Sequence, residues 1–287
     1  MAGGLGSRLW PMTESFSKHL LPVYDKPMIY YSLTNLMLVG IREILIVTTD
    51  RDYPLYQKLL GNGSKFGILI EYRVQEEPKG IPDGLQFALD WQTFNKVTLA
   101  LGDNLFFGHD LPRLLSPSDY GKGFAEVYAI KVKKPSSFGV IEFDKNFNVL
   151  SLEEKPKLPK SSYIVPGWYH YDNEVAKHLT MLKPSERGEV EITDLHNKYL
   201  GEKKLKVRVL GRGFSWFDTG TPSSLLHASI LIEGIQKNQN QLVCSPHEAA
   251  INAGLIKQED LDQKQLLKTQ YGRLLMDSIK QTKFVTK

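Results

Sequence analysis

The feature that most constrains the fold is an alternation of short apolar runs with helical patterns in the first part of the chain. Residues 43–49 (EILIVTT) and residues 96–101 (KVTLAL) are nearly continuous apolar runs. Around them apolar residues recur at helical spacing over residues 28–39, 53–60 and 83–94. Continuous apolar runs are typical of strands buried on both faces of a parallel sheet. The alternation therefore predicts a doubly wound, Rossmann-like α/β fold.

The pattern changes after Phe124. Three β-rich runs, AEVYAIKV, FGVIEF and VLSLEE, follow one another with polar turns between them, which favours a partly antiparallel sheet. Further elements are expected as helices over residues 173–182, 189–200 and 222–236 and as a strand over residues 205–210. From Cys244 onward the pattern is mostly helical. The expected fold class is α/β, with a mixed sheet and a helical C-terminal tail.

Composition excludes several classes of protein. The 287 residues are 41% hydrophobic and 24% charged, which is typical of a globular protein. The net charge of +4 comes from interspersed residues without a basic run, so a nucleic-acid partner is not expected. The lone Cys244 has no partner for a disulfide. Without an apolar run of membrane-spanning length or a signal-peptide pattern, we expect a cytoplasmic protein that does not contact a membrane.

The opening stretch MAGGLGSRLWPMTESFSKHLLPV concentrates glycines and basic residues. At Gly3, Gly4 and Gly6 the absence of side chains lets backbone N–H groups approach a phosphate, and Arg8 and Lys18 could neutralise its charge. The spacing matches neither the P-loop nor the dinucleotide fingerprint GxGxxG. From the residues alone, phosphate binding and an ordinary glycine turn followed by an exposed basic residue both remain open.

Two aspartates lie in motifs that suit a metal site. Asp103, in LGDN, directly follows the apolar run 96–101, where ligands bind in open α/β sheets. Asp218 lies in WFDTGT. Mg²⁺ prefers one or two carboxylates together with phosphate oxygens and water. Taken alone, each aspartate is more often a turn or helix-capping residue than a metal ligand.

The longer string GGLGSRLWPMTESFSKHLLPVYDKPMIYY resembles the sugar-1-phosphate nucleotidyltransferase signature GGxGxRLxPxTxxxxKxLLPV, and VYDKPMIYY resembles the short-form glucose-1-phosphate thymidylyltransferases in particular. The resemblance extends from Met1 to about Tyr271. It implies a nucleotidyltransferase-type core over residues 1–243, divided into a nucleotide-binding part (about 1–115) and a sugar-binding part (about 116–243). Residues 244–287 would form a helical appendage.

The resemblance also implies a role for particular residues and a set of ligands. The substrates would be dTTP and glucose 1-phosphate, the cofactor Mg²⁺, the assembly a homotetramer, and the product would feed deoxysugar synthesis such as that of dTDP-rhamnose. The implied residues are Arg8 and Lys18 for catalysis; Gly3, Gly4, Gly6, Gln75, Gly80 and Asp103 for the nucleotide; Gly139, Glu154, Lys155, Val165 and Trp216 for the sugar phosphate; and Asp103 and Asp218 for the metal.

The implied chemistry needs no covalent nucleophile. An oxygen of the sugar phosphate attacks the α-phosphorus in line and pyrophosphate leaves, while the protein supplies position and positive charge. A sugar phosphate is already anionic near neutral pH, so no proton has to be removed. This agrees with the absence of a Ser-His-Asp or Cys-His pattern, and none of the seven histidines has metal-ligand spacing.

Two departures from the family pattern affect these expectations. Residues 81–85 (IPDGL) stand where thymidylyltransferases usually have LAQAF, so base preference is less certain than reaction type. Family members also carry a buried apolar strand before the glycine loop, and Met1 stands where its last residue would lie. We expect that strand to be encoded upstream, and we expect its loss to reduce stability.

The sequence also allows functions other than nucleotidyl transfer from dTTP to glucose 1-phosphate. Within the same enzyme class, the protein could use a different nucleotide or a different sugar. A nucleotide-sugar-binding regulator without turnover is a second alternative, although the presence of Arg8, Lys18 and both aspartates argues against it. A dinucleotide-dependent dehydrogenase is disfavoured because Arg8 stands near the third glycine position of that fingerprint.

Overall fold

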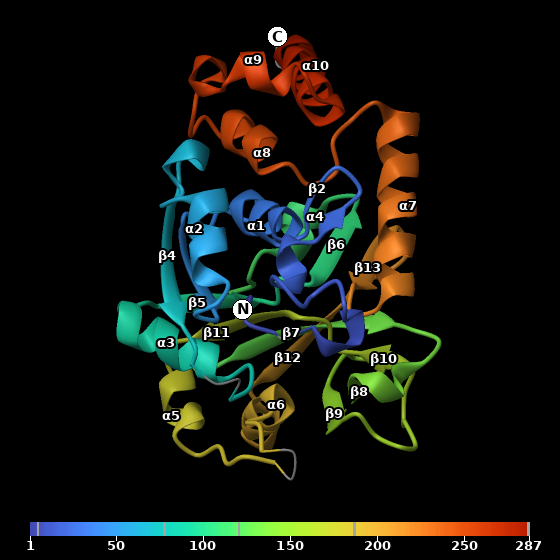
Figure 1. The fold of residues 1–287 in the computed structure, drawn as a ribbon. Coiled ribbons are helices and arrows are strands. Elements are labelled where there is room, and N and C mark those ends of the chain that lie inside the picture. The colour runs from blue at the N-terminus through green and yellow to red at the C-terminus, as the bar shows by residue number, and fades with distance from the viewer. Residues whose placement is uncertain (5, 77–78, 120, 186–187, 286–287) are drawn as a thin grey trace. The chain divides into compact units, whose positions relative to one another are not determined.

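The computed structural model describes residues 1–4, 6–76, 79–119, 121–185 and 188–285 (Figure 1). The chain divides into two compact units, and each is described by itself. The first comprises Met1 and residues 77–101 and 114–214, and is called the sheet unit. The second comprises residues 2–76, 102–113 and 215–287, and is called the loop unit.

The sheet unit contains a seven-stranded sheet with the order β5-β11-β7-β10-β8-β9, and β12 pairs with β7 in addition. Its strands are β5 (Lys96–Ala100), β7 (Ala125–Lys131), β8 (Gly139–Phe143), β9 (Val149–Glu154), β10 (Tyr163–Ile164), β11 (Trp168–Asp172) and β12 (Leu205–Val209). The pair β12–β7 is parallel, and the other described pairs of this sheet are antiparallel. The mixed sheet expected from the sequence is therefore present.

Helices α3 (Asp83–Trp91), α5 (Val175–Leu179) and α6 (Ile192–Gly201) belong to the sheet unit. Helix α6 packs against β9 and β12, and α5 contacts both α3 and α6; Figure 1 shows α5 and α6 together on one face of the strands. A single apolar core joins these helices to the sheet, with Val127 on β7 and Leu195 and Tyr199 on α6 fully buried. This packing fixes α6 beside the residues at the end of β9.

The loop unit has three small strand pairs, β1–β2, β3–β4 and β6–β13. Its strands are β1 (Pro22–Val23), β2 (Lys26–Pro27), β3 (Glu43–Thr48), β4 (Leu69–Val74) and β6 (Asn104–Gly108), together with most of β13 (Phe214–Asp218). Its helices are α1 (Ile29–Leu38), α2 (Tyr53–Leu60), α7 (Pro222–Gln239), α8 (Pro246–Asn252), α9 (Gln263–Leu266) and α10 (Gln270–Val285). Helix α4 (Leu111–Leu115) spans a point where the chain passes between units. Short 3₁₀ helices cover Ser7–Leu9, Lys18–Leu20, Ser64–Phe66, Pro135–Ser137 and Gln258–Asp260.

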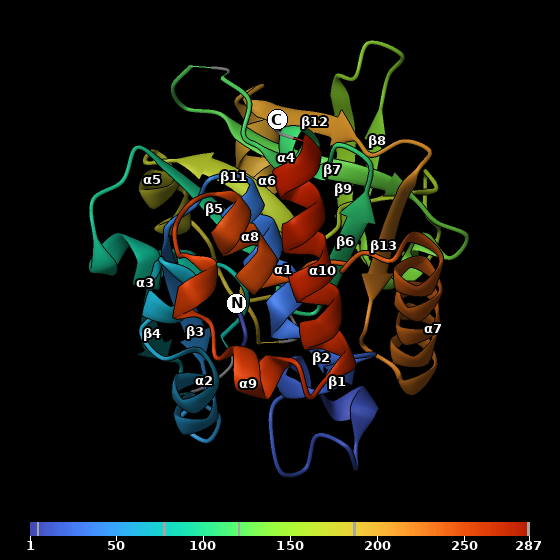
Figure 2. The same ribbon diagram turned by 90° about the horizontal axis from the view of Figure 1, so that it is seen from above.

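One apolar cluster holds the loop unit together around β3 and β4, which are parallel. It includes Leu33 of α1, Ile46 of β3 and Ile70 of β4, and it extends to Ala250 of α8. Helix α8 packs against α1 and against α10, and both views show α8 and α10 beside each other (Figure 1 and Figure 2). The C-terminal helices therefore belong to the same unit as the glycine loop.

Local sequence explains where α7 begins and ends. The Thr221 side chain accepts a hydrogen bond from the backbone N–H of Ser224, and the Ser224 hydroxyl accepts one from the backbone N–H of Thr221, so both satisfy donors at the helix start. Pro222 takes the first helical position, where no N–H is needed. Asn240 ends the helix in the left-handed region, with φ of 49°.

The element boundaries expected from the sequence agree closely with these helices and strands, and residues 53–60 match α2 without change. Six short strands were missed: β1, β2, β6, β10, β11 and β13. Strand β11 is buried along its whole length although it carries a histidine and an aspartate, so it shows neither alternation nor a continuous apolar run. The run 96–101 also differs from expectation, because β5 pairs with β11 in the antiparallel sense rather than with a parallel neighbour. Among the described residues no helix is long and apolar enough to cross a bilayer.

Candidate active site

The glycine loop of the loop unit is closed at Gly6. Gly6 has φ of 65°, and its carbonyl oxygen accepts hydrogen bonds from the backbone N–H of Leu9 (2.8 Å) and from the hydroxyl of Thr13 (2.9 Å). A Cβ at Gly6 would lie 2.9 Å from Thr13 Cγ2 and 3.1 Å from Lys18 Cβ. The turn therefore needs glycine for both its backbone angle and its space. Leu5 of the predicted loop lies outside the described residues.

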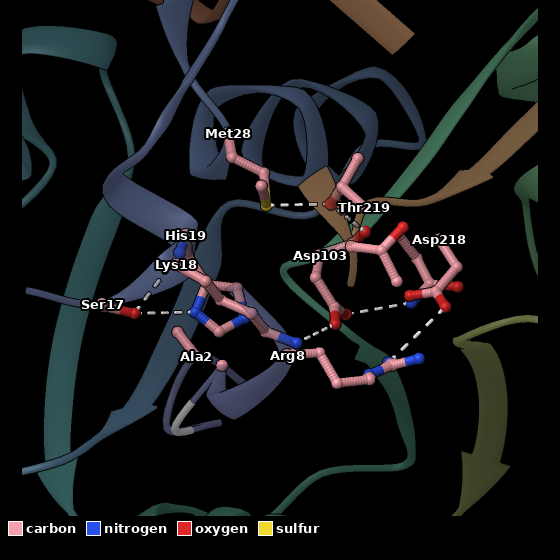
Figure 3. A network of polar contacts seen from close by, with 12 residues as sticks. Ala2, Arg8, Ser17, Lys18, His19, Met28, Asp103, Asp218 and Thr219 are labelled. Carbon is pink, nitrogen blue, oxygen red and sulfur yellow. Dashed lines mark hydrogen bonds and ion pairs between the residues drawn. The ribbon is translucent and has the colours of Figure 1, made fainter. Parts of the chain in front are cut away.

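The stem of Lys18 lies along this loop. A Cβ at Gly4 would come within 3.4 Å of Lys18 Cε, so both Gly4 and Gly6 leave room for the lysine. The Lys18 ammonium donates a hydrogen bond to the Asp103 carboxylate, and both side chains are about 14% exposed or less. The loop, the predicted catalytic lysine and a predicted metal ligand thus form one local structure (Figure 3).

A second cation–carboxylate pair lies in the same network. Arg8 Nη2 is 3.7 Å from Asp218 Oδ2, with the arginine 61% exposed and the aspartate 21% exposed. A Cβ at Gly220 would lie 2.4 Å from Arg8 Nη2, so the glycine after the aspartate leaves space for the guanidinium. Figure 3 shows Lys18 and Arg8 each directed at one of the two carboxylates.

Two links join the segments that carry the carboxylates. The Thr219 hydroxyl donates to the Asp103 carbonyl oxygen at 2.8 Å, and the backbone N–H of Thr219 lies 3.3 Å from the same oxygen. The Trp216 indole N–H donates to Asn104 Oδ1 at 2.7 Å, and the Asn104 amide donates to Asp103 Oδ1 at 3.0 Å. Sequence analysis missed Asn104 and Thr219, although both lie inside the two motifs that it singled out.

The charges of this network shift the pKa values of both aspartates. Burial alone raises the pKa of Asp103, but the charge of Lys18 and the hydrogen bonds from Lys18 and Asn104 outweigh it and lower the pKa below its ordinary value. Burial and then the charge of Asp103 raise the pKa of Asp218, against the effects of Arg8 and Lys18. Two ionised carboxylates close enough to repel each other form a donor set that suits a hard divalent cation. No group of three or more histidine, cysteine or acidic side chains that could hold a metal occurs in the described part of the chain.

Gln75 and Gly3, two predicted nucleotide-binding residues, lie together. Gln75 is buried, its backbone N–H donates to the Thr48 carbonyl at 2.7 Å, and its Oε1 lies 3.5 Å from the position of a Cβ on Gly3. Strands β3 and β4 set this arrangement, because they end at Thr48 and Val74 in paired register. The Gln75 amide is therefore held beside the start of the glycine loop.

The predicted sugar-phosphate residues of the sheet unit are brought together by strand pairing. Gly139 and Glu154 are direct partners in the β8–β9 pair, and the backbone N–H of Val165 donates to the Gly139 carbonyl at 2.9 Å. Lys155 Nζ lies 3.2 Å from Glu154 Oε1, and the Thr193 hydroxyl of α6 donates to Glu154 Oε2 at 2.6 Å. Both oxygens of Glu154 are thus oriented, and Thr193 was not found from the sequence.

Gly80 and the unusual stretch that follows it have structural explanations within the sheet unit. Gly80 has φ of 109° and pairs with Val190 in an isolated parallel β-bridge. A Cβ at Gly80 would lie 2.2 Å from the Val190 carbonyl oxygen. Pro82 and Asp83 start helix α3, where a missing N–H is harmless and an acidic residue is favourable. A Cβ at Gly84 would overlap Met1 Sδ, at 2.1 Å.

The scaffold is mixed α/β, two of its glycines leave room for a lysine stem, and two cation–carboxylate pairs lie beside them. This arrangement suits a class of protein that binds phosphates together with a divalent cation. Known proteins narrow the class. The family description "Nucleotidyl transferase" matches residues 1–234. A glucose-1-phosphate thymidylyltransferase of Neisseria gonorrhoeae is 45% identical over 97% of this chain and 98% of its own length, and one of Mycolicibacterium smegmatis is 46% identical over 96% of both. The chain belongs to the nucleotidyl transferase family.

Solved structures agree with this assignment. A Bacillus anthracis protein assigned as a glucose-1-phosphate thymidylyltransferase, in complex with sucrose, is 40% identical, with a TM-score of 0.73 over 80% of this chain and 92% of that one. A UDP-glucose pyrophosphorylase complexed with UDP-glucose, 23% identical, shares the fold, with a TM-score of 0.71 over 81% of this chain and 96% of that one. The family, the enzyme class and the mixed α/β fold predicted from the sequence are confirmed.

Proposed function

We propose that this protein transfers the thymidylyl group of dTTP to glucose 1-phosphate, giving dTDP-glucose and pyrophosphate. The observation that carries the proposal is the single network in which Lys18 meets Asp103 and Arg8 meets Asp218 beside the glycine loop. The thymidylyltransferases of similar sequence supply the substrates by analogy.

In this proposal the loop unit handles the triphosphate. Backbone N–H groups at Gly3, Gly4 and Gly6 bind phosphate oxygens, and Arg8 and Lys18 neutralise charge on the leaving pyrophosphate and on the transferred group. Asp103 and Asp218 hold the divalent cation, with Mg²⁺ as the proposed ion. When bound, Mg²⁺ would supply positive charge that offsets the negative charge of the phosphates. Gln75 reads the base through its amide, and Gly80, which belongs to the sheet unit, is proposed as a further base contact.

Residues of the sheet unit bind the sugar phosphate in this proposal. Glu154, oriented by Thr193, accepts hydrogen bonds from sugar hydroxyls, and Lys155 binds the phosphate. Gly139 and Val165 complete the sugar contacts within the sheet unit, and Trp216 of the loop unit is proposed as a further one. The nucleotide-binding part would cover residues of about 1–115, the sugar-binding part about 116–243, and the helical appendage 244–287.

The experiment that tests the proposal is a matrix of nucleoside triphosphates against sugar 1-phosphates with the purified protein, measuring pyrophosphate release. The highest kcat/KM is expected for dTTP with glucose 1-phosphate. A preference for another pair would establish the alternative of a different nucleotide or sugar, to which the stretch 81–85 points. Binding without pyrophosphate release would establish the inactive regulator. The proposed enzyme acts in the cytoplasm as a homotetramer and supplies deoxysugar synthesis.

A further inference from the structure

A buried hydrogen-bonded chain of two hydroxyl groups and one imidazole ring lies next to Lys18. Ser17 Oγ is 2.9 Å from His19 Nδ1 and 2.9 Å from Tyr56 Oη, and Tyr56 Oη is 3.2 Å from the Ala2 carbonyl oxygen. The side chains of Ser17, His19 and Tyr56 are at most 2% exposed. Ser17 and His19 flank Lys18 in the sequence, and Figure 3 shows both beside it. Tyr56 reaches Ser17 from α2.

The hydrogens of this chain run in one direction. The Ala2 carbonyl can only accept, so the single hydrogen of Tyr56 is directed to it. Tyr56 Oη then accepts the hydrogen of Ser17, and Ser17 Oγ accepts one from His19 Nδ1. With the Tyr56 hydrogen directed to the Ala2 carbonyl, each donor of the chain has an acceptor when His19 carries its hydrogen on Nδ1. Such buried, fully satisfied networks hold their members in one arrangement.

The chain ties together both ends of the phosphate-binding segment. Ala2 immediately precedes the glycine loop, and its backbone N–H is anchored to the Val47 carbonyl of β3 at 2.8 Å. Ser17 immediately precedes Lys18 and accepts a hydrogen bond from the backbone N–H of His19, which starts the 3₁₀ helix Lys18–Leu20. Tyr56, fully buried on α2, is the side chain that connects the two ends.

We propose that Tyr56 and Ser17 are positioning residues, whose hydroxyls fix the Lys18 ammonium relative to the glycine loop. This inference rests on the proposed function, since the position of Lys18 has kinetic consequences only if the lysine acts on a triphosphate. Without the bridge, the 3₁₀ helix that carries Lys18 is no longer tied to Ala2. The lysine then samples positions in which its charge no longer meets the transferred phosphate.

Tyr56→Phe tests the proposal because it removes one hydroxyl and little volume. We expect kcat to fall about 10-fold with little change in either KM, as for the loss of one buried hydrogen bond that acts on the transition state. Tyr31→Phe is the matched control, because the Tyr31 hydroxyl is also buried in the loop unit and donates to a backbone carbonyl, that of Val23 at 2.7 Å, but takes no part in the chain. Equal kcat values for the two variants would overturn the proposal.

A double-variant comparison separates positioning from a loss of stability. In a Lys18→Ala background, adding Tyr56→Phe should leave the residual kcat unchanged, because the group being positioned is gone. If Tyr56→Phe lowered kcat about 10-fold in the Lys18→Ala background as well, as it is expected to do in the wild-type background, the proposal would be overturned. Ser17→Thr should retain the wild-type kcat because threonine keeps the hydroxyl. Ser17→Ala should lower kcat as much as Tyr56→Phe does. A Ser17→Ala protein with wild-type kcat would contradict the inference.

A spectroscopic measurement keeps the inference testable without turnover. The ¹H–¹⁵N signal of the Lys18 ammonium should shift in Tyr56→Phe and stay in place in Tyr31→Phe. The His19 ring should carry its hydrogen on Nδ1 in the wild type. An unmoved Lys18 signal would refute the positioning role. A wild-type protein that releases no pyrophosphate from any substrate pair would refute the proposed function instead, and the Lys18 signal would still decide the inference.

Discussion

Lys18 and Asp103, 85 residues apart in the chain, share a charge-assisted hydrogen bond in which the ammonium donates to the carboxylate. The lysine proposed to meet phosphates is therefore partnered by a carboxylate proposed to hold the metal. Both groups are mostly withdrawn from water, where such a pair is sensitive to the loss of either member. In the proposed function, a metal-bound triphosphate would offer each group a new partner, phosphate oxygens for the lysine and the cation for the aspartate.

The first prediction concerns Asp103→Asn. This change should lower turnover at least about 100-fold, because it removes one of the two charges proposed to hold the cation. Pyrophosphate release measures turnover, and calorimetric titration with Mg²⁺ or Mn²⁺ in the presence of dTTP measures cation binding. Asp110→Asn is the control, since Asp110 is paired with the exposed Arg113 and has a positive φ that asparagine tolerates. Unchanged turnover in Asp103→Asn would rule out the metal role.

The second prediction concerns stability and pH. Burial and the charge of Asp103 raise the pKa of Asp218, so the folded state binds this proton more tightly than the unfolded chain does. The ionised Asp218 then lowers the stability of the fold as pH rises through its folded pKa. Asp218→Asn should consequently have a Tm at about pH 7 no lower than that of the wild type, and the gap should close below about pH 4, where the wild-type carboxyl is protonated.

Asp218→Asn should also be inactive, and its Tm should no longer rise when the divalent cation is added. Mg²⁺ should raise the Tm of the wild type in the presence of dTTP, because ligand binding to the folded state stabilises it, and should leave the Tm of Asp218→Asn almost unchanged. Differential scanning calorimetry over a pH series checks both statements. A variant less stable than the wild type at neutral pH would show that the pair with Arg8 outweighs the repulsion from Asp103.

The third prediction concerns Gly6→Ala. A side chain at φ of 65° costs roughly 1–2 kcal/mol of stability, and the new Cβ would press on Lys18 Cβ from 3.1 Å. Turnover should fall at least about 10-fold because the lysine is displaced. Gly254→Ala is matched in backbone strain, with φ of 68°, but its Cβ meets no atom within 4 Å. Chemical denaturation should give the larger loss for Gly6→Ala, because its Cβ also meets Thr13 Cγ2 at 2.9 Å, and only Gly6→Ala should lose kcat.

The fourth prediction concerns the base. Gln75→Ala should raise the KM for dTTP about 10-fold and leave the KM for glucose 1-phosphate unchanged, because the amide is proposed to hydrogen-bond the pyrimidine in both ground and transition states. Gln86→Ala is the control, since the Gln86 amide pairs with Asp90 on the exposed face of α3. Equal effects on both KM values would remove Gln75 from the base site.

The fifth prediction concerns the sugar. Thr193→Val removes the hydroxyl that donates to Glu154 Oε2 and should raise the KM for glucose 1-phosphate about 5- to 10-fold without affecting that for dTTP. Thr180→Val is the control, because the Thr180 hydroxyl bonds only the Lys177 carbonyl within the exposed end of α5. Initial-rate kinetics with each substrate varied in turn distinguishes the outcomes, and a dTTP effect as large as the sugar effect would contradict the assignment.

Much of this molecule could be predicted from local pattern. The helical spacing of residues 53–60 gave α2 without change, and the run 43–49 gave β3, because apolar periodicity reports which side of an element is buried. Strand β11 was missed because its burial depends on partners on both sides, and the polar His170 is satisfied by Thr98 and by the Leu115 carbonyl. Long-range hydrogen bonds of this kind leave no periodic signal in the sequence.

The sequence by itself determined the family, the identity of the glycine loop and the residue types at Arg8, Lys18, Asp103 and Asp218, because these are written in contiguous motifs. Only the tertiary structure decided that Lys18 meets Asp103, that Thr219 and Asn104 join the two aspartate segments, and that Tyr56 ties the lysine to Ala2. The reason is physical: a motif records short-range geometry, whereas contacts between distant segments depend on how the whole unit packs.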